Sequence, residues 1–310
     1  MTVSDVLAGT ARYHVEQGEA FTFVSSLPDG CVDAVITDPP YPEIDRDYGR
    51  LTEAEWFALM QPLVRECRRV LAPHGSAVFI LQPNSERVGR MRSWLWHFMA
   101  WVCDEWNMVQ DVWWWNPATP PTVHTHRTRG LMRPSVKACV WLGAPDCWRD
   151  QDAILWAPSE AMDCVSREDR SLQRKPSGQG MRPGRVGAAV DERGGSTPFN
   201  LWPLSNTNST MSGGASGHGA ATPYDLADRW TRYICKPKGI VLDPFGGSGT
   251  MGAAALRNGR RALLAERHVP YWPILDETMR EADRAPLTLP FEKPATTAPP
   301  TVAQVTLRLG

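Results

Sequence analysis

The sequence of 310 residues lacks the features that identify membrane-spanning, secreted and disulfide-rich proteins. Its most apolar stretch, residues 94–103, is too short to cross a bilayer and contains His97. No basic-then-apolar segment opens the chain, so we expect no signal peptide. The seven cysteines are scattered and never spaced CxxC, which favours reduced thiols over disulfides or metal ligands. We therefore predict a cytoplasmic protein with no metal site and no membrane partner.

Basic and acidic residues are also nearly balanced in number. Lysine and arginine number 33 and aspartate and glutamate 34, so the formal net charge is −1. No overall basic field draws the chain to nucleic acid or to an acidic membrane surface. Contact with a polyanion would therefore have to come from a local cluster of basic side chains. Tryptophan, by contrast, is abundant, and we expect most of the 14 residues to pack in the core.

The first candidate site follows a short, mostly apolar, β-branched run, residues 32–37, which predicts a buried strand. The run leads into Asp38-Pro39-Pro40-Tyr41. Prolines donate no backbone hydrogen bond and hold the preceding residue extended, so the strand ends at the acid. A carboxylate, a proline carbonyl and an aromatic ring are thus presented together at a strand's carboxyl end, where open α/β sheets bind ligands. On these residues alone, a proline-terminated strand with an exposed acid is an equal alternative.

Helices and strands are predicted to alternate along most of the chain. The predicted elements are a helix over 52–71 with a capping box at Thr52 and a kink at Pro62, a turn at 73–75, a strand over 77–81, a helix over 85–103, strands over 109–115 and 136–142, and a helix over 223–235. The pattern dissolves between residues 145 and 217, where we expect loops or a small irregular insert. A tail rich in proline, threonine and alanine follows residue 285.

A glycine motif, residues 239–252, forms the second candidate site. Its members are a strand at 240–242, Asp243, the GxGxxG glycines Gly247, Gly249 and Gly252, a following helix, and Glu266 at the end of the next strand, 262–265. This pattern predicts an adenosine-containing ligand, because a glycine turn lets the backbone approach the ligand and the acid accepts from ribose hydroxyls. No lysine precedes Thr250, so the motif is not an ATP P-loop.

Nicotinamide dinucleotide is the alternative ligand on these residues. Two observations argue against it. The glycine strand would normally open such a fold, yet here it lies near the C-terminal end of the sequence. The Asp-Pro-Pro-Tyr segment also offers a group of hydrogen-bond acceptors rather than the acid–base pair that hydride transfer needs.

Together, the two motifs resemble those of amino DNA methyltransferases, and supporting matches run along most of residues 11–281. Asp-Pro-Pro-Tyr resembles their catalytic motif, and residues 243–250 resemble their S-adenosylmethionine motif. The order of the motifs is similar to that of the β class. The resemblance implies an α/β, Rossmann-like methyltransferase fold with a mostly parallel, doubly wound sheet, permuted so that the catalytic half precedes the cofactor half. It also implies S-adenosylmethionine as the cofactor.

The resemblance assigns site residues as well. It implies catalytic roles for Asp38, Pro39, Pro40 and Tyr41. It implies contacts with the cofactor for Glu19, Ala20, Asp38, His218, Asp243, Phe245, Gly247, Gly249, Thr250 and Glu266. Glu19 stands where the family usually has aspartate, and Gly219 follows His218 where it usually has proline.

A chemical role for the strand end follows from the resemblance. The exocyclic amine of adenine or cytosine is a poor nucleophile, because its lone pair is delocalised into the ring. The carboxylate of Asp38 and the carbonyl of Pro39 would accept its two N–H bonds, while Tyr41 would stack on the base. This is positioning and electrostatic preorganisation rather than covalent catalysis. The base would be flipped out of the duplex, and the two motif strands would be neighbours in the sheet.

Other activities were weighed against this one. Cytosine carbon-5 methylation needs a cysteine nucleophile after proline, and no Pro-Cys dipeptide occurs. Amine methylation of a non-DNA substrate stays open, whereas a non-catalytic binder is disfavoured because Asp38 and Glu266 are intact. In the family, aspartate in the first motif position is associated mainly with adenine and serine mainly with cytosine. We therefore predict adenine N6 as the target, with cytosine N4 as the alternative.

Two segments of weak periodicity between the motifs concentrate basic residues, and we predict that they contact double-stranded DNA. Arginine suits both tasks, because it pairs with phosphate and binds guanine bidentately. The first segment is expected to contact the DNA backbone and the flipped base, and the second to read bases in a groove. For any single arginine, a solvated loop is the alternative. The predicted contacts are Arg127, Arg129 and Arg133 in the first segment, and Arg174, Lys175, Arg182 and Arg185 in the second.

We predict four parts of the chain and further partners. The parts are a catalytic half (1–144), an irregular insert that recognises the target (145–217), a cofactor half (218–284) and a loose tail (285–310). Besides DNA, a cognate restriction endonuclease and a homodimeric partner are left open.

Overall fold

The computed structural model describes residues 1–46, 49–119, 131–156, 194–205 and 222–287, and the backbone of 173–174 and 181–182. It divides into two units. The first unit is formed by Met1–Ile154 and Phe199–Thr288, and the second by Leu155–Pro198 and Leu289–Gly310. The two candidate motifs both lie in the first unit.

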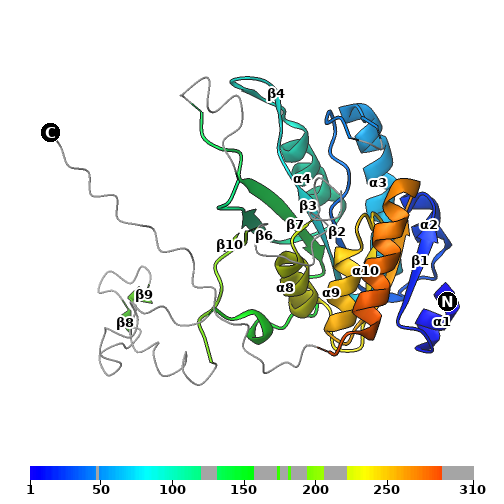
Figure 1. Ribbon diagram of the computed structural model, residues 1–310. Helices are drawn as coiled ribbons and strands as arrows, with labels where there is room; N and C mark the ends of the chain where they lie inside the picture. The colour runs from blue at the N-terminus through cyan, green and yellow to red at the C-terminus, as the bar shows by residue number, and fades with distance from the viewer. Residues whose placement is uncertain are drawn as a thin grey trace. The chain divides into compact units, whose positions relative to one another are not determined.

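The first unit is built on a mixed sheet, in which eight described strands follow the order β1-β12-β11-β2-β3-β7-β6-β10 (Figure 1). Neighbouring strands are parallel except where β7 pairs with β3 and β6. The fold is therefore the mostly parallel α/β type that the sequence predicts. The strands are β1 Tyr13–Gln17, β2 Val32–Thr37, β3 Leu71–Leu81, β6 Met108–Trp115, β7 Val136–Gly143, β10 Leu201–Pro203, β11 Ile240–Asp243 and β12 Arg261–Glu266.

Strands β2 and β11 are direct neighbours, although more than 200 residues separate them in the sequence. They pair in parallel, with Val241 opposite Ala34 and Leu242 opposite Val35. Parallel neighbours end at the same edge of a sheet. The segment after β2 and the glycine turn after β11 therefore leave the sheet side by side, as predicted.

Helices cover both faces of the sheet (Figure 1). Helices on the first face bury their apolar side chains with one face of the sheet in a single cluster. Helices α8, α9 and α10 lie on the other face, where α8 begins at Tyr224, one residue later than predicted, with Pro223 as its N-cap. The first group is α1 Val3–Ala8, α2 Ala20–Ser26, α3 Glu53–Val70 and α4 Trp94–Glu105, and the second is α8 Tyr224–Ile234, α9 Thr250–Arg257 and α10 Trp272–Arg284.

Helix α3 forms where its sequence predicts. The Thr52 side chain accepts from the backbone N–H of Glu55, and the Glu55 carboxylate accepts from the backbone N–H of Thr52, which completes the capping box. Apolar residues at helical spacing, including Trp56 and Met60, are fully buried. Pro62 lies inside the helix.

The predicted turn at residues 73–75 is wrong, because strand β3 continues through it. The pairing with β2 shifts register instead: the partner advances from Val32 to Ala34 while β3 advances from Leu71 to Ser76. The extra residues form a bulge that accommodates the proline and the glycine. Proline and glycine occur both in bulges and in tight turns, so these residues alone do not distinguish the two structures.

The helix predicted for residues 85–103 begins only at Trp94. The residues before it form a two-stranded hairpin of β4 Ser85–Arg87 and β5 Arg90–Met91. Gly89 lies between these strands with a φ of 77°, a conformation that favours glycine. Val88 and Met91 continue the helical spacing of Trp94 and Phe98 in the sequence, but both are exposed in the hairpin, so the start of the predicted helix was placed too early.

The region from 145 to 217, predicted to be irregular, contains four short described elements. They are η1 Asp152–Ile154, β8 Gln173–Arg174, β9 Met181–Arg182 and β10 Leu201–Pro203. Strand β10 extends the main sheet beside β6, whereas β8 and β9 pair with each other in the second unit. The predicted bounds of the four parts of the chain stay a prediction.

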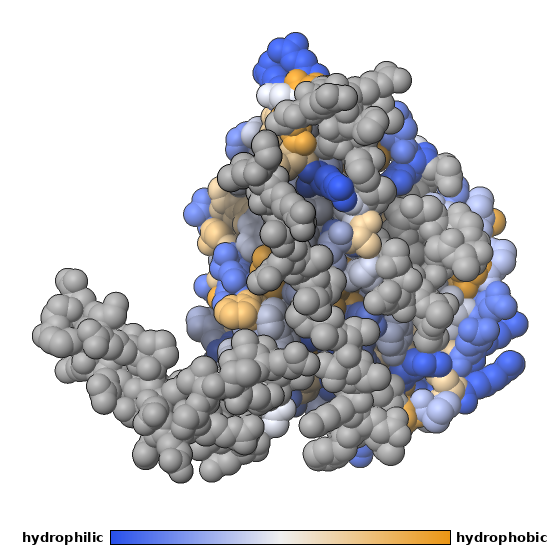
Figure 2. All heavy atoms as spheres, turned by 60° about the vertical axis from the view of Figure 1, so that its left-hand side comes forward, coloured by the Kyte–Doolittle hydropathy of each residue, from blue (hydrophilic) through white to orange (hydrophobic). Residues whose placement is uncertain are grey.

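Six of the 14 tryptophans are buried, and Trp101, Trp106 and Trp113 pack partly buried against the core. Trp141 on β7, Trp202 on β10, and Trp230 and Tyr233 on α8 pack ring against ring with centroids 4.6–6.3 Å apart. On the face drawn in Figure 2, hydrophobic and hydrophilic side chains are interspersed wherever the residues are coloured. None of the helices in the described part of the chain has the length and apolarity to cross a membrane.

Candidate active site

A cavity of about 870 Å³ lies in the first unit, where the segments after β2 and β11 leave the sheet. Both candidate motifs line it, together with residues that follow β1 and β12. This volume suits a nucleotide-sized ligand. The predicted site residues that line the cavity are Glu19, Ala20, Asp38, Pro39, Pro40, Tyr41, Asp243, Phe245, Gly247, Thr250 and Glu266.

The glycine turn has the geometry that its sequence predicts. Gly247 and Gly249 have φ values of 51° and 83°, in the left-handed region where a side chain would be strained. Helix α9 begins directly afterwards. A Cβ on Gly252 would lie 2.6 Å from Sδ of Met279 on α10, so glycine there allows the two helices to pack closely. The turn thus brings backbone to the wall of the cavity.

Glu266 ends β12 beside this turn. Its carboxylate accepts from the backbone N–H of Gly247 at 2.8 Å and from that of His268 at 2.6 Å, one bond to each oxygen. The residue is 9 % exposed. A carboxylate accepts about four hydrogen bonds. Glu266 can therefore be fixed by the backbone and still accept from a pair of ligand hydroxyls.

Asp243 is the most deeply buried acid of the site, with 3 % exposure. Its Oδ1 accepts from the Thr37 hydroxyl at 2.6 Å and from the Phe245 N–H at 3.1 Å. Burial, aided by the nearby carboxylates of Glu266 and Asp38, raises the pKa of Asp243 to about 7 against the lowering effect of the two hydrogen bonds. Asp243 therefore exchanges a proton near neutral pH.

The carboxylate of Asp38 is fixed by three donors from three parts of the chain. The Tyr41 hydroxyl donates to Oδ1. The Thr222 hydroxyl donates to Oδ2 at 2.6 Å, and the Lys137 ammonium lies 3.5 Å from the same oxygen. Thr222 directly precedes the N-cap of α8, and Lys137 lies on β7. The acid is thus held in one orientation at the cavity wall.

The proline carbonyls after β2 differ in their partners. The indole N–H of Trp56 donates to the carbonyl of Pro40 at 2.6 Å, and the amide of Asn84 donates to that of Pro42 at 2.7 Å. Among the described residues, none donates to the carbonyl of Pro39, which lines the cavity. The carbonyl of Pro39, one residue after Asp38, is therefore a candidate acceptor for a ligand.

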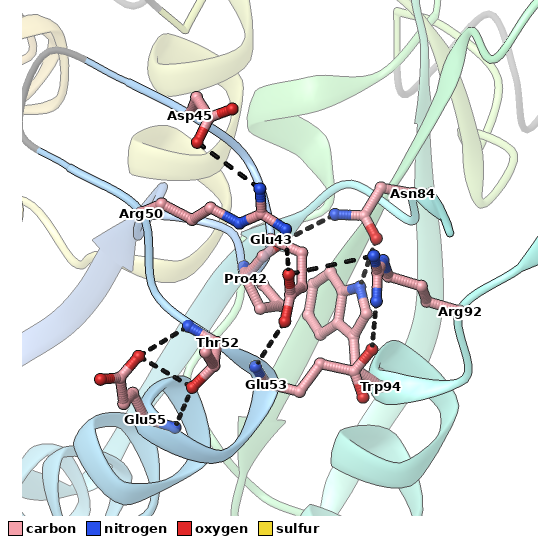
Figure 3. A network of polar contacts seen from close by, with 10 residues as sticks. All are labelled: Pro42, Glu43, Asp45, Arg50, Thr52, Glu53, Glu55, Asn84, Arg92 and Trp94. Carbon is pink, nitrogen blue, oxygen red and sulfur yellow. Dashed lines mark hydrogen bonds and ion pairs between the residues drawn. The ribbon is translucent and has the colours of Figure 1, made fainter. Parts of the chain in front are cut away.

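A network of charged side chains holds the loop that continues from this segment (Figure 3). Glu43 has a φ of 63° and pairs with both Arg50 and Arg92, and Arg92 also pairs with Glu53 at 3.4 Å. The hydrogen bond from Arg50 lowers the pKa of the Glu43 carboxyl. Asp45 and Arg50, which form a further pair at 3.7 Å, line the cavity. The network thus fixes one wall of the site.

Three predicted cofactor residues need separate mention. Glu19 is the N-cap of α2, lines the cavity and forms an ion pair with Arg267 at 3.3 Å. His218 lies outside the described residues. Gly249 is in the glycine turn but does not line the cavity, whereas the other described members of the predicted cofactor set do. Their assignment to S-adenosylmethionine stays a prediction.

The predicted DNA contacts are only partly described. Arg133 is exposed and donates to the carbonyl of Thr119 at 3.4 Å. Arg174 and Arg182 lie on the paired strands β8 and β9, whose backbone alone is described. The role of the basic segments stays a prediction, and the remaining members, Arg127, Arg129, Lys175 and Arg185, lie outside the described residues.

Sequence reasoning missed Lys137 and Thr222. A lysine inside a predicted buried strand was one available signal, since a charged side chain there needs a partner. A threonine directly before the proline that opens a helix was the other. In the described part of the chain, no group of three His, Cys, Asp or Glu side chains is arranged to hold a metal ion.

Comparison with known proteins adds an independent finding. A family model described as DNA methylase, N6_N4_Mtase, matches residues 32–277. Type II methyltransferase M.PvuII of Proteus hauseri is 25 % identical over 273 residues, which cover 82 % of this chain and 80 % of that protein.

Solved structures show the same fold. The PvuII DNA methyltransferase, named cytosine-N4-specific, superposes with a TM-score of 0.66 at 19 % identity over 86 % of each chain. The structure of M1.HpyAVI in complex with SAM superposes with a TM-score of 0.52 at 17 % identity, over 86 % of this chain and 98 % of that one.

Proposed function

Because this chain belongs to the N6/N4 DNA methylase family, whose members methylate exocyclic amines of DNA bases with S-adenosylmethionine, we propose that its target atom is N6 of adenine. The carboxylate of Asp38 beside the carbonyl of Pro39, to which no described residue donates, is the observation that supports methylation of an exocyclic amine most directly. Two neighbouring acceptors match the two N–H bonds of an amine. The target base has to leave the duplex to reach them.

The residues of the cavity fit S-adenosylmethionine. Glu266 keeps acceptor capacity for two ribose hydroxyls after binding the N–H groups of Gly247 and His268. The glycine turn exposes backbone, and Phe245 offers an aromatic side chain at the same wall. Glu266, Asp243, Phe245 and the turn would therefore hold the cofactor, together with Glu19 and Ala20, which follow β1 beside Glu266. When bound, the cofactor supplies a methyl group on a sulfonium.

Asp38 and Pro39 would act on the amine of the target base. An amine lone pair delocalised into the ring attacks poorly. Accepting both N–H bonds at fixed oxygens restores the lone pair to the nitrogen and directs it toward the methyl donor. Asp38 is suited to this because three donors already fix its orientation. Tyr41 would stack on the base, since its ring is held beside the acid.

Cytosine N4 is the second candidate target. The PvuII methyltransferase, which shares the fold, is named cytosine-N4-specific, and this favours cytosine. Asp38 favours adenine, because aspartate in the first position of the motif is associated mainly with adenine methylation in the family that the sequence resembles. Both bases offer an amine beside a ring nitrogen, so the chemistry at Asp38 and Pro39 is the same.

Recognition of DNA is assigned by this proposal to the basic segments around residues 124–133 and 167–185. Arginines there can neutralise phosphates and read bases. The net charge of the chain is −1 and gives no overall attraction to DNA, so binding needs such a local cluster of basic residues. M.PvuII is named a type II methyltransferase, and on that likeness we extend the proposal to a restriction–modification pair.

Sequencing of DNA from cells that express the protein, with detection of modified bases, tests the proposal. N6-methyladenine confined to one short sequence is expected. Cells that express Asp38→Ala provide the matched control. N4-methylcytosine dependent on Asp38 would replace the first candidate with the second, and unmodified DNA would contradict both.

A further inference from the structure

Lys137 is a charged residue near the start of a strand, β7, in which the side chains that follow it are almost wholly buried. The five residues that follow it on β7, 138–142, are each at most 2 % exposed. The Lys137 side chain itself is 17 % exposed. An ammonium in such a place is costly to desolvate unless it has polar partners. Its partners therefore indicate what it does.

The described partners of the Lys137 ammonium all belong to the wall of the cavity. Nζ donates to the Tyr41 hydroxyl at 2.9 Å and lies 3.5 Å from Oδ2 of Asp38. It also lies 5.3 Å from the ring centroid of Tyr41 and 4.9 Å from that of Trp114, which is its pairing partner on β6. The lysine thus contacts both the acid and the aromatic ring that the proposed function requires.

These contacts form a directed chain of donors. Lys137 has three N–H bonds and no acceptor, so the Tyr41 oxygen must accept from it. The Tyr41 hydroxyl hydrogen is thereby left to donate to Asp38. The Thr222 hydroxyl donates to Oδ2 of the same carboxylate. Without the ammonium, Tyr41 could rotate, and the carboxylate would lose the nearest positive charge among the described residues.

We propose that Lys137 is a positioning residue for methyl transfer, which holds the Asp38 carboxylate and the Tyr41 ring in the arrangement that receives the target amine. This inference rests on the proposed function. It assigns to Lys137 no contact with the cofactor. Loss of the ammonium should therefore slow the chemical step and leave cofactor affinity unchanged.

The chain offers a matched control in Lys236. Its ammonium pairs with Asp33 at 2.9 Å, near the other end of β2 from Asp38, and its side chain is 57 % exposed. Lys236 does not line the cavity. Lys236→Met thus removes a lysine–aspartate pair from the same strand without touching the site.

The test measures single-turnover methylation of DNA by the full chain with labelled S-adenosylmethionine, together with cofactor affinity and melting temperature. We expect Lys137→Met to slow transfer about 10- to 100-fold, since a charge-assisted contact in a preorganised site is lost. Cofactor affinity and melting temperature should match the wild type. Lys137→Arg, which keeps the charge, should recover much of the rate, and Lys236→Met should transfer at the wild-type rate.

A double-mutant cycle separates positioning from general stability. In a Tyr41→Phe background, Lys137→Met should lower the rate of methyl transfer by a smaller factor than it does alone. The Tyr41 hydroxyl that Lys137 holds is already absent there. Three outcomes would overturn the inference. They are fully additive effects of the two substitutions on the rate, a rate for Lys137→Met within about threefold of the wild type, and an equal loss of rate in Lys236→Met.

If the Lys137→Met variant does not fold, the same rate and melting measurements on Lys137→Gln test the inference. A slow rate with native melting supports the inference, and a wild-type rate overturns it. Absence of transfer by the wild-type protein would overturn the proposed function, and the inference with it.

Discussion

Replacement of Asp243 by asparagine should change how the stability of the protein depends on pH. The folded state raises the pKa of Asp243 from 3.8 to about 7, chiefly through burial. A raised pKa means that the folded state binds this proton more tightly than the unfolded state. The contribution to stability is therefore fully present below about pH 4 and is lost as pH rises through 7. The difference between the two pKa values corresponds to about 4 kcal/mol, which is an upper bound for one site.

Asparagine is a close test of this effect. Its side-chain oxygen can still accept from the Thr37 hydroxyl and the Phe245 N–H, the two donors to Oδ1 in the wild type. It cannot ionise, so it avoids the cost of a buried negative charge near Glu266 and Asp38. The variant should gain stability relative to the wild type as pH rises, by as much as about 4 kcal/mol at pH 8.

Urea unfolding of both proteins without cofactor, from pH 4.5 to pH 8.5, measures the difference in the free energy of unfolding. Taking the difference removes the titration of groups that the two proteins share. The reasoning requires the Asp243→Asn advantage to grow with pH and to level off above about pH 7.5. An advantage that stays constant across the range would refute it, since Asp243 would then not hold a proton in the folded state.

Four further predictions concern turnover, cofactor binding and DNA. Asp38→Ala should reduce methylation on the order of 100-fold or more with cofactor affinity retained, and near-normal turnover would contradict its role. Tyr41→Phe should be milder than Tyr41→Ala in the same assay, because stacking needs the ring rather than the hydroxyl. Glu266→Ala should weaken S-adenosylmethionine binding by about 1.5–3 kcal/mol in calorimetry, and unchanged affinity would identify another acid as the ribose acceptor. Replacement of the arginines in segments 124–133 and 167–185 by alanine should weaken DNA binding and flatten its salt dependence; unchanged affinity, salt slope and site choice would place recognition elsewhere.

The sequence predicted the parts of the fold that depend on local chemistry and strand order. Asp38 and Asp243 each end a β-branched apolar run, and parallel strands bring their ends to one edge, so the cavity between the motifs was predictable. The capping box at Thr52 gave the start of α3 correctly. In these cases the pattern and the physical cause lie within a few residues of each other.

Other features were not predictable because distant residues determine them. The bulge in β3 depends on its pairing with β2, and the hairpin before α4 interrupts what looked like one helix. Lys137 and Thr222 reach Asp38 from positions 99 and 184 residues away in the sequence. A lysine in a buried strand and a threonine before a helix each signal a polar role, but only the sheet and the packing of α8 reveal that Asp38 is the partner.

The most direct test of the central claim is methyl transfer in a purified system. Labelled S-adenosylmethionine is incubated with unmethylated DNA and either the wild-type protein or Asp38→Ala, and the DNA is digested to nucleosides and analysed by mass spectrometry. The account predicts label in N6-methyldeoxyadenosine with the wild type and at least about 100-fold less with the variant. Label in a carbon-methylated base, or equal label with both proteins, would contradict it.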